Sequence, residues 1–177
     1  MAATLRFSAV PFVIALVCLP AMARDLPRGW RLPTEKELSA GDRNGSPSRY
    51  ARAFADFNGD GVEDEALLLR STTFNGEAVW VYLSNGATNG SWVKLYEEKW
   101  DFPSRDIDTF NGIDVVAPGI ISYGGYCDSD SNSDGDGTRP KLRLRNPSIE
   151  TFHFERSSAV YFWSREHKNF ICVWTSD

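Results

Sequence analysis

Short apolar segments separated by turn-forming residues run through most of this 177-residue chain from Arg49 onward. They are rich in Val, Ile, Tyr, Phe and Trp, which favour strands, and no helical apolar period appears after Gly41. The segment from Lys141 to Arg145 alternates leucine with cations, as a half-buried strand does. We therefore predict an all-β fold, a single antiparallel β domain over 49–177 that forms a sandwich or a barrel-like meander.

The segment 24–48 precedes this domain and is rich in turn formers. Thr34 and Glu37 have the spacing of a capping box, in which each side chain accepts a hydrogen bond from the other residue's backbone N–H. Gly41 would end a helix that began there. We expect one short N-terminal helix in this segment.

The first 23 residues have the pattern of a secretory signal peptide. Arg6 supplies positive charge, Phe7 to Leu19 is an apolar run, and Ala21-Met22-Ala23 is a small-x-small cleavage pattern. The run is too short to cross a hydrocarbon core of about 30 Å as a helix. We predict cleavage after Ala23, a periplasmic or secreted protein, and no membrane span. Lipid attachment at Cys18 is the alternative, although Ala15-Leu16-Val17 lacks the usual small residues next to the cysteine.

Cleavage would remove Cys18 and leave Cys127 and Cys172 in the mature chain. Paired cysteines in an exported protein indicate a disulfide, because the compartment is oxidising. We predict a Cys127–Cys172 bond, and two free thiols are the alternative.

An acidic stretch between two predicted strands carries the clearest chemical pattern. Asp56-Phe57-Asn58-Gly59-Asp60-Gly61-Val62-Glu63-Asp64 places side-chain oxygens at positions one, three, five and nine, with glycine at position six. Ca²⁺ takes six to eight oxygen ligands, and alternate residues of a tight loop can point inward together. We predict one Ca²⁺ site, and a solvated acidic turn is the alternative. Its expected ligands are the side chains of Asp56, Asn58, Asp60 and Asp64 and the carbonyl of Val62.

This D-x-N-x-D-G-x-x-D pattern resembles the calcium loops of FG-GAP and VCBS repeats, which join two strands in the propeller of integrin α subunits. The resemblance implies the same ligand set and covers about 15 residues. An EF-hand differs, because it needs an acid where Leu67 stands here. A propeller needs several such loops, so the resemblance does not extend to that fold.

A second acidic stretch runs from Cys127 to Gly137. It is either a flexible solvated loop or a second metal site, and Lys141 stands where an EF-hand would place its last acid. Tyr123 and Tyr126 precede it, and exposed tyrosines beside glycines are typical of contact surfaces. We therefore treat this region as a candidate partner-contact loop. Its oxygen-bearing residues are Asp128, Asp130, Asn132, Asp134 and Asp136.

The sequence favours binding over catalysis. The two histidines, His153 and His167, are expected at the surface, and nucleophile-elbow, zinc and phosphate-loop motifs are missing from the sequence. An acid pair such as Asp106 and Asp108 would suit a glycosidase only at a fixed separation. A net charge of −5 argues against nucleic acid as a partner.

We expect an exported calcium-binding domain with a non-catalytic binding role. One form of that role is an inhibitor or immunity protein that acts on a hydrolase or toxin of the cell envelope. A metal-dependent or carboxylate-based envelope hydrolase and a purely structural calcium-binding module are the alternatives. Among the tryptophans, Trp174 lies in a predicted strand and is expected in the core, whereas Trp100 is a candidate for exposure.

Overall fold

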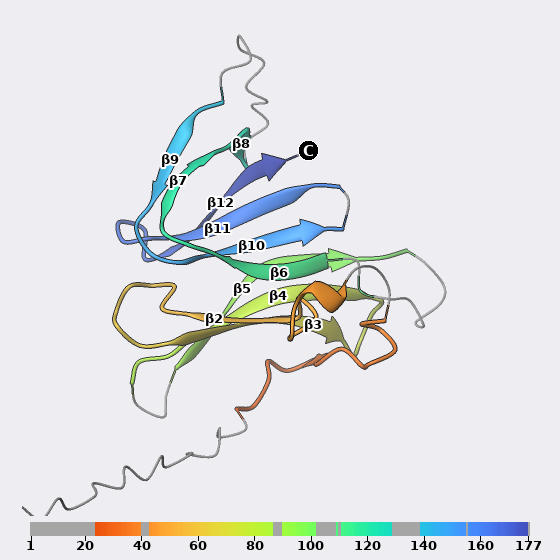
Figure 1. Cartoon of the computed structure of the whole chain (residues 1–177). Helices are drawn as coiled ribbons and strands as arrows, with labels where there is room; N and C mark the ends of the chain where they lie inside the picture. The colour runs from red at the N-terminus through yellow and green to blue at the C-terminus, as the bar shows by residue number, and fades with distance from the viewer. Residues whose placement is uncertain are drawn as a thin grey trace, which may run out of the picture.

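The computed structural model is built from two layers of antiparallel β-sheet that pack face to face (Figure 1). It describes residues 24–39, 43–86, 90–101, 109, 111–128, 139–154 and 156–176. All strand pairings in the described ranges are antiparallel, so the prediction of an all-β antiparallel fold is confirmed. The predicted signal peptide lies outside these residues.

The N-terminal sheet has the order β1-β3-β4-β5, and β2 pairs with β3 beside β1. The central strand β3 is buried along its whole length, because the second sheet covers one face and N-terminal residues lie against the other. The strands are β1 (Trp30–Arg31), β2 (Arg52–Ala55), β3 (Asp64–Ser71), β4 (Gly76–Leu83) and β5 (Ser91–Lys99).

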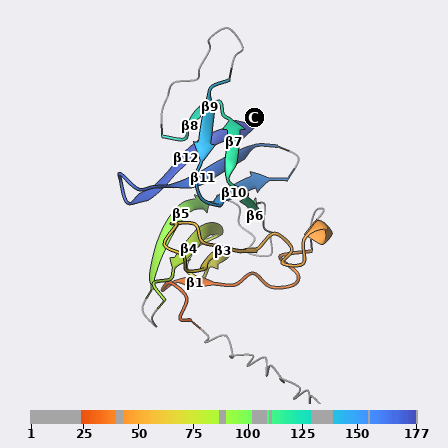
Figure 2. The same ribbon diagram turned by 60° about the vertical axis from the view of Figure 1, so that its left-hand side comes forward.

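The C-terminal sheet has the order β6-β10-β11-β12-β8, and β7 pairs with β9. The β7–β9 pair continues the β6–β10 pair beyond a bend at Pro118, and folds over one face of the sheet (Figures 1 and 2). The strands are β6 (Asn111–Val116), β7 (Gly119–Ser122), β8 (Gly125–Tyr126), β9 (Lys141–Leu144), β10 (Ser148–His153), β11 (Ser158–Ser164) and β12 (Asn169–Ser176).

The described core consists of two hydrophobic clusters. The larger lies between the sheets, where Leu68 and Val79 of the first sheet pack with Ile113 and Ile149 of the second. The smaller lies under the β7–β9 pair and contains Val173. Strand alternation produces both clusters, because successive side chains of β11 and β12 face opposite sides of their sheet.

The predicted N-terminal helix is not present in the described residues. Thr34 and Glu37 do form the reciprocal bonds of a capping box, at 2.7 and 3.3 Å, but residues 35–38 make a single turn. The Glu37 carboxylate pairs instead with Arg31 and Arg70, and its carbonyl accepts the N–H of Thr109. These long-range contacts hold the chain in a turn against the sheet.

The one helical element in the described ranges is a short 3-10 turn, η1 (Arg43–Gly45). It places the buried Arg43 guanidinium against the backbone carbonyls of Thr109 and Asn111, at 2.8 and 2.9 Å. None of the described helical structure has the length and apolar character of a membrane crossing.

Candidate functional site

The Asp56 loop, residues 56–64, joins β2 to β3 and is positioned by its glycines. Gly59 and Gly61 both have positive φ, at +76° and +89°, which side chains other than glycine adopt at a cost. A Cβ at Gly59 would also come within 2.6 Å of the Asn146 side chain. Asn146 lies between β9 and β10, so the loop is seated against the second sheet.

The loop folds around its own carboxylates. Asp56 Oδ1 accepts the N–H groups of Gly59 and Asp60 at 2.7 and 3.0 Å, and its Oδ2 accepts that of Gly61 at 2.8 Å. Asp60 Oδ1 accepts the N–H of Val62 at 2.8 Å. Short-range bonds of this kind, from an aspartate side chain to backbone N–H groups a few residues later, are typical of Asx turns. They keep the side-chain oxygens close to the loop backbone.

Asn58 connects two of the predicted ligand residues. Its Oδ1 accepts the N–H of Asp60 at 2.9 Å, and its Nδ2 donates to Asp60 Oδ2 at 3.0 Å. This amide therefore satisfies part of the Asp60 carboxylate within the loop.

Asp64 anchors the end of the loop inside the protein. It is fully buried, and its Oδ2 accepts the N–H of Phe57 at 3.0 Å while its Oδ1 accepts that of Ser84 at 2.9 Å. Burial raises the pKa of this carboxyl, the backbone donors oppose the rise, and the negative charge of Asp60 adds to it.

The oxygen atoms that this loop offers are suitable ligands for a hard cation. An ionised carboxylate has about four lone-pair sites, so Asp56 and Asp60 retain acceptor capacity beyond the bonds described above. Carboxylate and amide oxygens are the ligands that Ca²⁺ takes. Within the described ranges, however, no three or more His, Cys, Asp or Glu side chains form a ready-made metal cluster.

The predicted contact region lies beside the disulfide. The Tyr123 and Tyr126 rings meet edge to face with centroids 5.7 Å apart, and Tyr126 is 45% exposed. Burial is the main cause that raises the pKa of the Tyr123 phenol, and the contact with Tyr126 raises this pKa further. Asp128 is exposed, whereas Asp130, Asn132, Asp134 and Asp136 lie outside the described residues.

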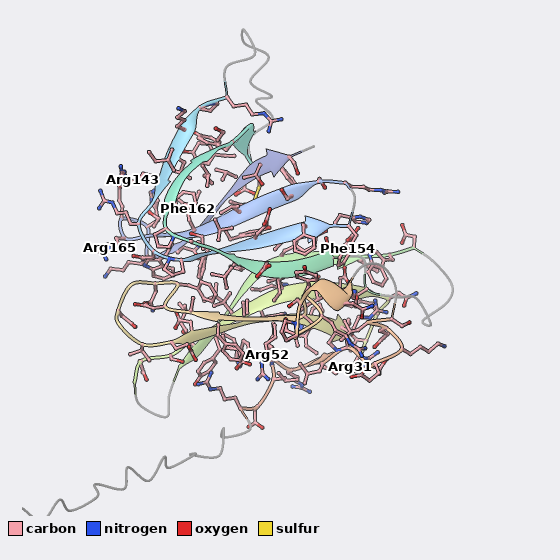
Figure 3. The ribbon with its side chains drawn as sticks, in the orientation of Figure 1. Arg31, Arg52, Arg143, Phe154, Phe162 and Arg165 are labelled. Carbon is pink, nitrogen blue, oxygen red and sulfur yellow. A yellow bond between two sulfur atoms is a disulfide. The ribbon has the colours of Figure 1, made fainter. Side chains whose placement is uncertain are left out.

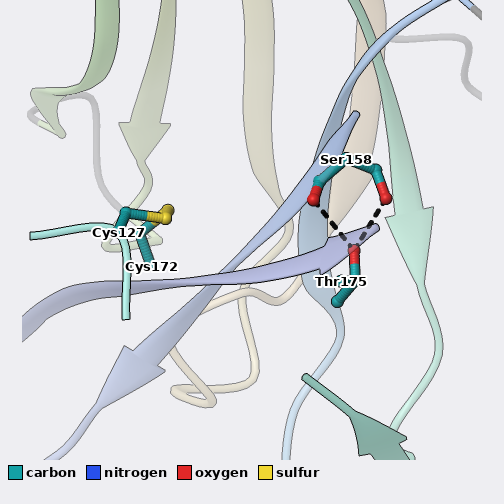
Figure 4. Close-up of a disulfide and its surroundings, with 4 residues drawn as sticks. All are labelled: Cys127, Ser158, Cys172 and Thr175. Atoms are coloured by element: carbon teal, nitrogen blue, oxygen red, sulfur yellow. Dashed lines mark hydrogen bonds between the residues drawn. A yellow bond between two sulfur atoms is a disulfide. The ribbon is translucent and has the colours of Figure 1, made fainter. Parts of the chain in front are cut away.

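The predicted disulfide between Cys127 and Cys172 is confirmed, with Cα atoms 5.3 Å apart (Figure 4). It ties the end of β8 to β12, and the Cys127 N–H also donates to the Cys172 carbonyl at 3.1 Å. Figure 4 also shows Ser158 of β11 and Thr175 of β12, where the Thr175 hydroxyl contacts both oxygens of Ser158. These bonds fix the strands that carry the contact region.

A cleft of about 190 Å³ between the two sheets was not predicted. Asn111 Nδ2 donates to Glu77 Oε1 at 2.6 Å and to Glu98 Oε2 at 3.3 Å, and the Tyr96 hydroxyl donates to Glu98 at 3.0 Å. His153 also lines the cleft. These residues come from four strands that only the tertiary fold brings together.

Glu77 lies behind this cleft and is fully buried. Burial raises its pKa to about 7, against the lowering effect of the Asn111 hydrogen bonds. A glutamate at the start of an otherwise apolar strand was the signal available in the sequence. His167 is exposed, as predicted, whereas His153, also expected at the surface, is half-buried. The Asp106 and Asp108 pair lies outside the described residues.

Comparison with protein-family models, curated proteins and solved structures gave no significant match to this chain. The likeness to FG-GAP and VCBS calcium loops therefore rests on the residues of the Asp56 loop alone.

Proposed function

We propose that this protein is an exported β domain, braced by one Ca²⁺ in the Asp56 loop, whose role is to bind another protein. The observation that carries the calcium proposal is the hydrogen-bonded arrangement that keeps the oxygens of Asp56, Asn58 and Asp60 on one short loop. Like charges about 4 Å apart in water repel by about 1 kcal/mol, and more where water is excluded. A divalent cation would replace that repulsion with attraction.

The residues that would hold the ion are those of the predicted ligand set. Asp56, Asn58 and Asp60 would supply side-chain oxygens from the loop, and Val62 a carbonyl oxygen. Asp64 would supply its carboxylate from the start of β3. The bound ion would neutralise these acids and fix the loop between them.

Such a loop would brace both layers of the fold. Asp64 connects it to Ser84 at the end of β4, and Asn146 Nδ2 donates to the Phe57 carbonyl at 3.4 Å from the second sheet. We therefore assign calcium a stabilising role, because an ion bound only by the native state raises its stability.

The binding role rests on the region around Tyr123 and Tyr126. Tyr126 presents an exposed aromatic ring, its neighbour Cys127 is held by the disulfide, and tyrosine is enriched at protein interfaces. A surface held in place in this way loses little conformational entropy on binding. We propose a protein of the cell envelope as the partner, with inhibition of a hydrolase or toxin as the specific role.

Capture from an envelope extract tests this role. The mature protein should retain the same partner in repeated experiments, and Tyr126→Ala should weaken capture by about tenfold, as loss of an aromatic hot spot does. Val115→Ala, at another exposed apolar position, is the matched control. Equal capture by wild type and Tyr126→Ala would remove this surface from the proposal.

An envelope hydrolase is the second candidate, favoured by the cleft that contains Glu98, Tyr96 and His153. A carboxyl group beside a buried acid is an arrangement that hydrolases use for proton transfer. Release of soluble fragments from purified cell wall, lost in Glu98→Gln and kept in Glu97→Gln, would favour this candidate. Equal release by both variants, or none by the wild type, would argue against it.

A further inference from the structure

A hollow of about 350 Å³ lies at one edge of the C-terminal sheet, between the β9–β10 connection and the β11–β12 turn. Figure 3 shows three of its residues, Arg143, Phe162 and Arg165, at the same edge of the molecule. We call this hollow the arginine groove. It is defined here by Arg143, Arg145, Asn146, Phe162, Trp163 and Arg165.

The groove carries an excess of positive charge. Arg143, Arg145 and Arg165 are exposed, and none of them forms a salt bridge with any described residue. One acid, Glu166, also lines the hollow, and it too makes no ion pair within the described ranges. Three guanidinium groups therefore face a small hollow with a single carboxylate among them.

The fold explains why the cations gather there. Leu144 is buried beneath the β7–β9 pair, so strand alternation leaves Arg143 and Arg145 on the outer face. Arg165 stands at the turn after β11. The bend between β9 and β10 brings these distant segments to one hollow.

Aromatic side chains provide the apolar part of the groove. Phe162 is half-buried, and Trp163 packs edge to face on Phe170 with centroids 5.2 Å apart. Packing of this kind holds an aromatic ring in place, and a held ring can stack on a planar or apolar group of a ligand.

We propose that the arginine groove binds a small ligand that carries a phosphate or carboxylate group on a planar or apolar body. A guanidinium group matches an oxyanion with two parallel N–H donors, and such charge-assisted bonds are among the strong ones. The volume is at the lower end of the range for small-molecule sites, about 300–1,000 Å³, which suits one anionic group and its immediate neighbour. The proposal does not rest on the calcium site, although Asn146 lines the groove and also contacts the Asp56 loop.

Ligand titration monitored by NMR tests the proposal on the mature protein. Phenyl phosphate and benzoate carry the two anionic groups on the same ring, and benzamide is the neutral analogue. We expect saturable shifts at the groove with the anions and none with benzamide. Tighter binding of phenyl phosphate would indicate a phosphate ligand, and tighter binding of benzoate a carboxylate.

Charge-removing variants complete the test. Arg143→Gln and Arg165→Gln should each weaken anion binding by about tenfold, which corresponds to about 1.4 kcal/mol at 25 °C. Arg28→Gln removes the same charge from an exposed arginine outside the groove and should bind as the wild type does. Equal affinity in all three variants, or binding of benzamide as tight as that of benzoate, would overturn the proposal.

Discussion

The buried carboxylate of Asp64 accepts the backbone N–H of Ser84 at 2.9 Å, which joins the start of β3 to the residue that follows β4. The same carboxylate accepts the N–H of Phe57, a fully buried residue of the Asp56 loop. Asp64 therefore connects the Asp56 loop to the N-terminal sheet.

Asp64→Asn should lower the free energy of unfolding by about 2–3 kcal/mol, measured by urea denaturation in the presence of a calcium chelator. The amide has one acceptor oxygen where the carboxylate has two, so one buried N–H loses its partner. The chelator removes any contribution from calcium. Asp114→Asn changes an exposed aspartate and should stay close to the wild type. An Asp64→Asn protein as stable as that control would contradict this role.

Glu77 should make stability fall as the pH rises. Its pKa is about 7 in the folded protein because the side chain is buried, whereas it returns to an ordinary value near 4.5 on unfolding. Between these values the folded state holds a proton that the unfolded state has released, so raising the pH favours unfolding.

Comparison of Glu77→Gln with the wild type measures this effect. The wild type should lose up to about 3 kcal/mol relative to Glu77→Gln between about pH 5 and about pH 8. Glutamine keeps an oxygen for the Asn111 donors and does not titrate. Glu63→Gln, at an exposed glutamate, is the control. Parallel pH profiles for wild type and Glu77→Gln would show that Glu77 does not titrate in this range.

The Cys127–Cys172 bond should contribute strongly to stability. It spans 45 residues, and the loop-entropy model assigns such a crosslink about 4 kcal/mol. The double variant Cys127→Ala, Cys172→Ala should lose about that much in urea denaturation. Mass spectrometry of the exported protein should detect alkylatable thiols at these positions only after reduction. Thiols that react without reductant would refute the bond.

Strand content and the disulfide were predictable because both leave local signals. Lys141 to Leu144 alternates between exposed and buried positions, and forms the half-buried strand β9 that the pattern indicates. The prediction of an N-terminal helix was wrong because a single turn forms the capping-box bonds of Thr34 and Glu37 equally well. The local sequence pattern does not reveal that Arg31 and Arg70 both pair with the Glu37 carboxylate.

Burial of individual aromatic residues depended on the tertiary fold. Trp174 was expected in the core but is 42% exposed, whereas its neighbour Val173, which faces the opposite side of β12, is fully buried. Trp100 was a candidate for exposure but is buried, with the Arg70 guanidinium over its ring. The cleft at Glu98 was missed for the same reason, since only the packing of one sheet on the other brings Tyr96 of β5 and Asn111 of β6 to it.

The proposed binding of one calcium ion by the Asp56 loop can be measured directly. Equilibrium dialysis of the mature protein, stripped with a chelator and then equilibrated with radioactive calcium, measures binding directly. We predict one ion per chain for the wild type and for Asp114→Asn, and binding weakened by at least about tenfold in Asp60→Asn, since the ion loses a charged ligand. No bound calcium at millimolar concentrations, or equal binding by Asp60→Asn and the wild type, would show that the Asp56 loop is not a calcium site.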